Sequence, residues 1–313
     1  MKELDFLFDI SLTGKVRPWP DKARKSRFLA EIYREIDLKK AIRLNQCANT
    51  LTFRVAPDER KKLDKANFCR VRLCPMCVWR RTLKVFGQTS AIMQELKKQD
   101  KYAYIFISLT AENCTGKDLS ATIDLMMKAW NRFVGYAQFR HIVKGFYRGF
   151  EVTHNLDQQS DSFDTFHPHF HCIFAVDKNY FKSKDYLSHR EWLELWQKAL
   201  KVEYEPWIFI KRVRGNTAKA VAEIAKYAVK DGDYIIPDDI DMTIKTVKIL
   251  DEALDKRRFV SFGGVFKETH QKLNLDNPED GDLVLRHKLH DIPDYRLVTY
   301  IWHSGYRQYV KSA

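Results

Sequence analysis

The sequence predicts an α+β fold in which helices flank a central antiparallel β-sheet, preceded by a basic N-terminal region. With 45% hydrophobic and 13% aromatic residues, the 313-residue chain can bury a large core. Strand and helix patterns alternate along its middle, but two strand patterns follow each other directly. The polar stretch between them, NLDQQSDSFDTFHP, suits a hairpin. Antiparallel pairing of these strands favours α+β over a doubly wound α/β fold.

Periodicity and turn residues place the individual elements. Apolar residues three and four positions apart predict helices at about residues 23–45, 78–98, 118–139, 188–200, 217–230 and 243–256. Aromatic and β-branched runs predict strands at 102–110, 144–154, 169–176 and 205–213.

Charge and turn residues divide the chain into three expected parts: 1–100, 101–235 and 236–313. KKQDK closes a helix near residue 100, where the charge balance also changes. Residues 1–100 contain 23 Lys and Arg against 12 Asp and Glu, and so carry +11 of the net charge of +13. The second boundary falls in KDGDYIIPDD, which contains a glycine, a proline and four aspartates.

The basic N-terminal region indicates a polyanionic partner. In DERKKLDKANFCRVRLCPMCVWRR the cations surround cysteines instead of following an amphipathic helix. This favours nucleic acid over an anionic membrane surface, and a merely solvated surface is the third interpretation. Because the sequence has neither an apolar run of membrane-spanning length nor a signal-peptide pattern, we expect a cytoplasmic protein.

Four cysteines predict a structural zinc site. Cys69, Cys74 and Cys77 form a C-x4-C-x2-C run, in which Pro75 bends the last two thiols together as in a zinc knuckle. Cys47 would complete a tetrahedral set of thiolates. Disulfides are not expected without a secretory signal. The alternative is a group of reduced, partly buried thiols.

The stretch FHPHFHCIFAV, residues 166–176, carries histidines at alternate positions into an apolar run. Proline is tolerated at a strand's first residue, so we expect the strand to begin near Pro168. With a period of two residues, His169 and His171 then point to one face, and Phe170 and Phe174 point to the other.

Two imidazoles side by side on a strand are typical of a divalent-metal site. Glu151, on the expected hairpin partner, could face His169 and His171, and a carboxylate would favour Mg²⁺ or Mn²⁺. His167 has the same parity but precedes the proline, so the third ligand is either Glu151 or His167. The alternative is a pair of hydrogen-bonded core histidines.

The predicted helix at 217–230 carries a second set of reactive groups. Glu223, Tyr227 and Lys230 are spaced to share one helix face, next to Lys226. A tyrosine hydroxyl beside cations is a candidate nucleophile toward phosphorus, and a carboxylate one turn away can accept a proton. The alternative is a tyrosine at the edge of the core, on a solvated helix face.

These motifs together resemble the rolling-circle plasmid replication initiators of the HUH endonuclease superfamily. HUH denotes two histidines around a bulky hydrophobic residue, matched by HFH at 169–171, and the nucleophilic tyrosine on a later helix is matched by Tyr227. FISLTAEN, FYRGFEVTHN, CRVRLCPMCVWRR and FGGVFKE also resemble this branch. The likeness covers residues 40–270. By analogy, Glu151 would be the third metal ligand, and Glu223 takes the place of a second tyrosine.

The resemblance implies a metal-dependent, site-specific DNA endonuclease and strand transferase. Tyr227 would nick one strand of plasmid origin DNA and leave a 5′-phosphotyrosine and a free 3′-OH, and the strand would be rejoined at termination. Catalytic Mn²⁺ or Mg²⁺ and structural Zn²⁺ are the expected cofactors. The expected protein partners are a host helicase and polymerase, a homodimer is left open, and no membrane partner is expected.

The same resemblance suggests a role for each expected part of the chain. Residues 1–100 would bind DNA and zinc, 101–235 would form the endonuclease, and 236–313 would complete the fold or assist DNA binding. Two other functions compete with replication. A conjugative relaxase or transposase would use the same chemistry, and a zinc-dependent DNA-binding regulator would use none.

Overall fold

The computed structural model describes residues 4–11, 14–214, 221, 230–236, 238–284 and 294–312. The chain divides into two compact units, one formed by Met1–Arg81 with Gly281–Ala313 and the other by Thr82–Asp280. These limits differ from the boundaries at 100 and 235 suggested by charge and turns, because the C-terminal strands return to the N-terminal unit. The expected C-terminal segment is therefore shared between the two units.

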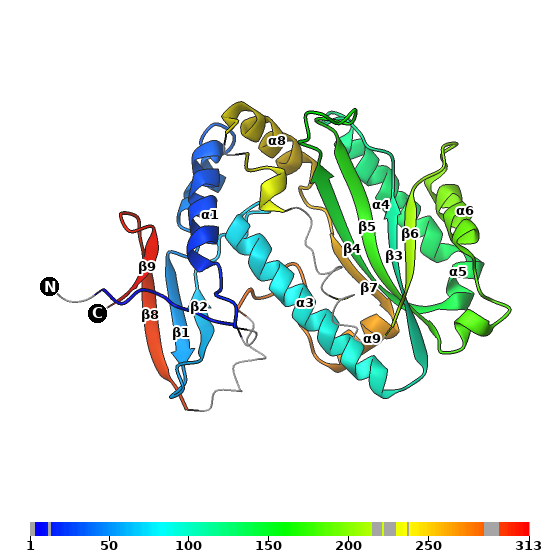
Figure 1. Ribbon diagram of the computed structural model, residues 1–313, viewed down its shortest axis with the longest axis horizontal. Helices are drawn as coiled ribbons and strands as arrows, with labels where there is room; N and C mark the ends of the chain where they lie inside the picture. The colour runs from blue at the N-terminus through cyan, green and yellow to red at the C-terminus, as the bar shows by residue number, and fades with distance from the viewer. Residues whose placement is uncertain are drawn as a thin grey trace. The chain divides into compact units, whose positions relative to one another are not determined.

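The N-terminal unit contains a four-stranded antiparallel sheet in the order β2-β1-β8-β9 (Figure 1). The sequence patterns missed these strands because β2, KKLDKA, is mostly charged, and because β1 pairs with β8 from the far end of the chain. The strands are β1 (Thr50–Val55), β2 (Lys61–Ala66), β8 (Arg296–His303) and β9 (Gln308–Lys311).

The helix expected over residues 23–45 is wrong as a single element. The structure has two helices, α1 (Trp19–Tyr33) and α2 (Leu38–Asn45). Asp37 between them is extended, and its side chain accepts a hydrogen bond from the backbone N–H of Lys40. This cap starts a second helix where the periodicity by itself continues.

The second unit contains a five-stranded sheet in the order β6-β3-β5-β4-β7, and each neighbouring pair is antiparallel (Figure 1). The predicted α+β class with antiparallel sheets is confirmed, as is the hairpin of the two consecutive strands. The strands are β3 (Tyr102–Thr110), β4 (Val143–His154), β5 (Phe166–Asp177), β6 (Ile208–Val213) and β7 (Val260–Gly264).

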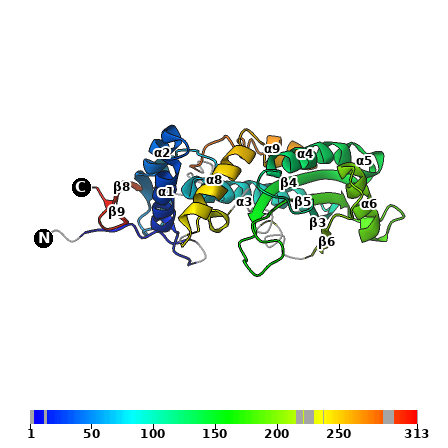
Figure 2. The ribbon, with the colours of Figure 1, turned by 90° about the horizontal axis from the view of Figure 1, so that it is seen from above.

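Helices α4 (Leu119–Gly135), α5 (Ala137–Ile142) and α6 (His189–Leu200) lie together along this sheet (Figure 2). Trp130 of α4 packs against Phe170 and Phe174 of β5, at ring centroid distances of 5.6 and 6.4 Å. The apolar side chains of β5 are thus buried against helices. The side chains of His169 and His171 therefore lie on the opposite face of the sheet.

The other described helices are α3 (Pro75–Lys98), which contains the limit between the units, α8 (Ile240–Ala253), α9 (Val265–Lys272) and the short 3₁₀ turns η1 (Tyr180–Lys182) and η2 (Asp231–Asp233). The helix expected over 118–139 is divided because Tyr136 is extended. Among the described residues, no helix combines the length and apolar character needed to cross a membrane.

Strand β5 begins at Phe166, so the expected start at Pro168 is wrong. Pro168 lies inside the strand, opposite Val152 of β4. The N–H of Phe166 points toward the β3 side, where it bonds to the carbonyl of Cys114, and by alternation the nitrogen of Pro168 points to that side too. The β3 ladder already ends at the pair Thr110 and His169, so the proline removes no ladder hydrogen bond.

The helix predicted over 217–230 lies almost wholly outside the described residues, and Tyr227, Glu223 and Lys226 lie outside them too. Lys230 is described. Its backbone is extended, with φ −90° and ψ 148°, and it precedes η2. The predicted helix therefore does not include its expected last residue.

Candidate active site and cysteine cluster

Three side chains converge on the face of the five-stranded sheet opposite α4. His169 lies directly across from Glu151 in the register of β5 and β4, and His171 is two residues further on. Their Nε2 atoms are 3.0 Å apart, and Oε2 of Glu151 is 3.4 Å from Nε2 of His169 and 3.1 Å from Nε2 of His171. Two rigid, paired strands thus hold three potential metal ligands close together.

The other nitrogen of each imidazole has its own partner. Nδ1 of His169 lies 3.0 Å from the carbonyl oxygen of His167, and Nδ1 of His171 lies 2.9 Å from Oγ of Ser108 on β3. A carbonyl can only accept, so Nδ1 of His169 donates to it, and Nε2 is the nitrogen that faces Glu151 and His171. Such outer contacts orient metal-binding histidines. Ser108 was not among the residues expected from the sequence, although the FISLTAEN motif contains it.

Glu151 is almost completely buried, with 2% of its surface exposed. Burial raises the pKa of its carboxyl, but hydrogen bonds with His169 and His171 and the charge of Lys230 oppose this and hold the pKa well below its usual range. The ammonium of Lys230 lies 3.1 Å from Oε1 of Glu151. The carboxylate is therefore ionised at neutral pH, with the ammonium of Lys230 beside Oε1 and the two imidazoles beside Oε2.

The donor set fits a hard divalent cation. Ligands at right angles around an ion with bonds of about 2.1 Å lie about 3.0 Å apart, because the separation is the bond length multiplied by √2. The separations of 3.0, 3.1 and 3.4 Å match one face of an octahedron. One carboxylate and two imidazoles suit Mn²⁺ or Mg²⁺ with open positions for substrate.

His167 has a different environment. Its Nδ1 lies 2.7 Å from Oδ1 of Asn113, and its side chain does not belong to the group formed by Glu151, His169 and His171. Burial and the neighbouring imidazoles lower the pKa of His167 to about 4. Of the two residues considered as a third ligand, the geometry favours Glu151.

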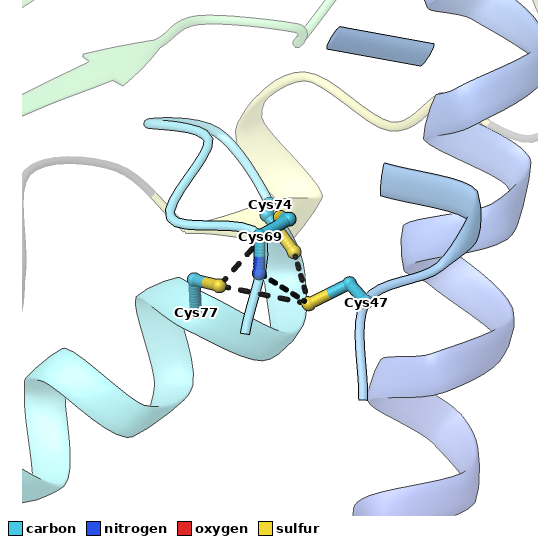
Figure 3. A group of neighbouring side chains, drawn as sticks. All are labelled: Cys47, Cys69, Cys74 and Cys77. Carbon is cyan, nitrogen blue, oxygen red and sulfur yellow. Dashed lines mark hydrogen bonds between the residues drawn. The ribbon is translucent and has the colours of Figure 1, made fainter. Parts of the chain in front are cut away.

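The four predicted zinc ligands come together in the N-terminal unit (Figure 3). Cys47 follows α2, Cys69 follows β2, and Cys74 and Cys77 lie at the start of α3. The sulfur of Cys47 is 3.6 Å from those of Cys74 and Cys77, and the sulfurs of Cys69 and Cys77 are 3.7 Å apart. Thiolates around a tetrahedral zinc with bonds of about 2.3 Å are separated by about 3.8 Å. The cluster therefore fits zinc.

Backbone and hydroxyl groups surround these sulfurs. The N–H of Arg70 donates to the sulfur of Cys77, and Arg70 has the left-handed φ of 60° that turns its N–H inward. Burial raises the pKa of the Cys74 thiol, but hydrogen bonds with the other cysteines and with Ser26 oppose this and hold the pKa well below its usual range. A readily ionised thiol suits a metal ligand. Ser26, on α1, was not foreseen from sequence.

A family model described as "Replication protein" matches residues 60–310. "Protein rep" of Bacillus amyloliquefaciens is 37% identical, with 98% of each chain covered, and "Protein rep" of Streptococcus pneumoniae is 37% identical, with 89% of this chain and 86% of that protein covered. No solved structure matches the chain.

A third relative, "Protein rep" of a Bacillus species, is 40% identical and covers 79% of this chain and 84% of its own length. The chain belongs to the replication protein (Rep) family. The family match and the names of these relatives support a plasmid replication initiator, the class that the sequence motifs resemble.

Proposed function

We propose that this replication initiator nicks one strand of its plasmid's double-strand origin by tyrosine transesterification and rejoins the strand at termination. The observation that carries the proposal is the buried group of Glu151, His169 and His171, which has three ligand atoms on rigid paired strands. A metal-ligand face of this kind suits phosphodiester chemistry. The helix predicted to carry Tyr227 lies between β6 and Lys230 in the chain.

In the proposed reaction, the phenolate oxygen of Tyr227 attacks the phosphorus of one phosphodiester. The bond to the 3′ oxygen breaks, and that oxygen takes a proton to become a free 3′-OH, while the 5′ phosphate becomes esterified to Tyr227. A phenol with a pKa of about 10 is only about 0.1% ionised at pH 7. The positive charges of Lys226 and Lys230 favour its ionised form.

Glu151, His169 and His171 would hold Mn²⁺ or Mg²⁺, which would withdraw charge from a non-bridging oxygen of the phosphodiester. In this proposal, Lys230 pairs with Glu151 and supplies part of the positive charge of the site. Because one phosphoester replaces another, the bond energy is retained for rejoining. No nucleotide cofactor is needed.

We further propose that Cys47, Cys69, Cys74 and Cys77 bind one structural Zn²⁺, and that the basic N-terminal unit binds duplex origin DNA. The sulfur separations and the charge distribution support this assignment. The free 3′-OH would be extended by a host polymerase behind a host helicase. A homodimer on the origin remains compatible with this scheme.

A nicking assay on supercoiled plasmid that carries the cognate origin tests the proposed reaction. The wild type should convert supercoiled to open-circular DNA and remain attached to the 5′ end, and Tyr227→Phe should do neither. Tyr186→Phe, at an exposed tyrosine outside the site, is the matched control and should nick normally. A nicking and covalently attached Tyr227→Phe protein would exclude Tyr227 as the nucleophile.

A further inference from the structure

Two large aromatic rings are exposed at the edge strand β6, Trp207 directly before the strand and Phe209 within it. Trp207 is 61% exposed to solvent, and Phe209 is 42% exposed. The rings are nearly parallel, with an interplanar angle of 17° and centroids 6.3 Å apart. β6 pairs with β3 at one edge of the five-stranded sheet (Figure 1). Large rings exposed side by side cost solvation free energy, which indicates a binding surface.

Phe209 lies on the same face of the sheet as the histidine cluster, and the ring of Trp207, just before the strand, stacks against it. Phe209 is opposite Ser108 of β3, and Ser108 is opposite His171 of β5, so all three side chains point to one side. Phe209 packs edge-on against Phe106 at 6.0 Å, and Phe106 stacks on His171 at 5.8 Å. A row of rings thus connects the exposed edge to the candidate metal centre.

The charge around the rings is positive. The stretch PWIFIKRVR, residues 206–214, contains three cations and no acid. Lys211 is exposed and lies opposite Phe106, on the face that carries the rings, whereas Arg212 points to the other face and lies over the ring of Phe181. The preceding acid, Glu205, is paired with Arg190 at 2.6 Å. Aromatic faces interleaved with cations match a ligand that combines flat bases with phosphates.

We propose that Trp207 and Phe209 form a stacking platform for the unpaired bases of single-stranded origin DNA, next to the phosphodiester to be cut. This inference rests on the proposed nicking function and names where the substrate strand lies. Phe209 is two strands from His171, a span of about 10 Å. A strand stacked on the platform can therefore enter the metal centre without leaving the face of the sheet.

Single-stranded DNA fits this surface better than duplex DNA or a second copy of the chain. Bases in a duplex are stacked on each other, so their faces are not free for Trp207 and Phe209. Pairing of two β6 edges would bring Lys211 and Arg212 of one copy close to those of the other, and exposed cations on an edge strand oppose such pairing. Only unpaired bases use both the rings and the charges.

Binding of a fluorescein-labelled single strand of about 16 nucleotides, measured by anisotropy, tests the platform. The full-length Tyr227→Phe protein is used throughout, so that no strand is cut and the result does not depend on nicking. Adding Trp207→Ala or Phe209→Ala should weaken binding about tenfold or more, because base stacking on an aromatic side chain contributes that much. Adding Trp207→Phe should retain most of the affinity, because it keeps a ring.

The matched control is Tyr186→Ala, which removes a ring of similar exposure from a loop outside β6 and should bind like the parent. Affinity for an origin duplex should change less than twofold in every variant. Three results would overturn the platform: unchanged single-strand affinity in Trp207→Ala with Phe209→Ala, an equal loss for duplex DNA, or light scattering that shows a parent dimer converted to monomers. Failure of wild-type nicking would instead contradict the proposed function and leave this measurement intact.

Discussion

At the scale of single residues, the active-site candidate depends on which nitrogen of each imidazole faces Glu151. The carbonyl of His167 and the hydroxyl of Ser108 occupy the two Nδ1 atoms, so both Nε2 atoms are turned toward Oε2 of Glu151. The separations of 3.0 to 3.4 Å bring three donors around one point. Loss of any of the three donors is therefore expected to reduce nicking, and loss of the His167 side chain is expected to reduce it much less.

Substitution of the proposed ligands should remove nicking. His171→Ala and Glu151→Gln are expected to lower the nicking rate by about a hundredfold or more, because a bound metal contributes several kcal/mol of transition-state stabilisation. Chelation of the wild type should have the same effect, and added Mn²⁺ should restore activity. His167→Ala should be milder, and His141→Ala, at an exposed histidine away from the cluster, is the control. Full activity of His171→Ala in EDTA would rule out the metal centre.

Glu223 is expected to act at termination and not at initiation. Tyr227 is esterified after the first nick, so the second cleavage needs another nucleophile, and a carboxylate one helical turn away can activate water. Glu223→Ala should still nick and form the covalent adduct, but its replication products should be longer than one plasmid unit. Gel analysis of product length decides this. Unit-length products at the normal rate would leave Glu223 as a residue that only pairs with neighbouring lysines.

At the scale of elements, the cysteine cluster joins three segments that follow or begin different helices and strands. Cys47 lies in the turn after α2, Cys69 follows β2, Cys74 directly precedes α3, and Cys77 lies in its first turn. The loop from Cys69 to Cys74 has little regular structure, and Arg70 in it has a positive φ. A metal bound by all four sulfurs would fix this loop against both helices.

The zinc assignment predicts one zinc per chain by elemental analysis. Cys74→Ser should lose the metal and lower the melting temperature of the protein, because the free energy of binding a structural zinc adds to the free energy of folding. Cys114→Ser, at a partly buried cysteine outside the cluster, should keep the zinc and melt like the wild type. Purified protein without zinc, in which Cys74→Ser melts normally, would mean that the cluster consists of reduced thiols.

At the scale of the whole molecule, the charge is divided very unequally between the two compact units. Met1–Arg81 and Gly281–Ala313 together contain 25 Lys and Arg against 13 Asp and Glu, which is +12, and Thr82–Asp280 contains 29 against 28, which is +1. The returning C-terminal strands thus add to the basic character of the N-terminal unit. This unit is the expected source of most phosphate contacts.

Duplex binding by the full chain should therefore fall steeply with salt. If six phosphates are neutralised, affinity should drop by about a thousandfold between 50 and 200 mM salt, because each contact releases condensed counterions. Charge reversal at Lys62 and Lys65 of β2 should reduce the slope of log K against log salt by about one for each lost contact, and reversal at Lys182 and Lys184 of the second unit should not. If both charge reversals reduced the slope equally, duplex binding would not be confined to the N-terminal unit.

Much of the α+β architecture follows from local pattern. The alternation in HFHCIF determines which residues of β5 share a face, because successive side chains of any strand point to opposite sides. Strand β3 and helix α6 lie within one residue of the expected ranges, since their periodicity is strong and α6 is capped by Ser188 and Glu191. The short spacing from Cys69 to Cys77 likewise indicates a zinc knuckle from the sequence alone.

Other features depend on contacts between distant parts of the chain, which only the tertiary structure decides. The strand register sets Glu151 opposite His169, and a slip of one residue would turn the carboxylate to the other face. Pairing of β1 with β8 and the approach of Cys47 to Cys77 likewise join residues far apart in sequence. The sequence by itself determined the residue types and the local faces. Their assembly into two clusters required the whole fold, because register and long-range pairing minimise the free energy of the entire chain.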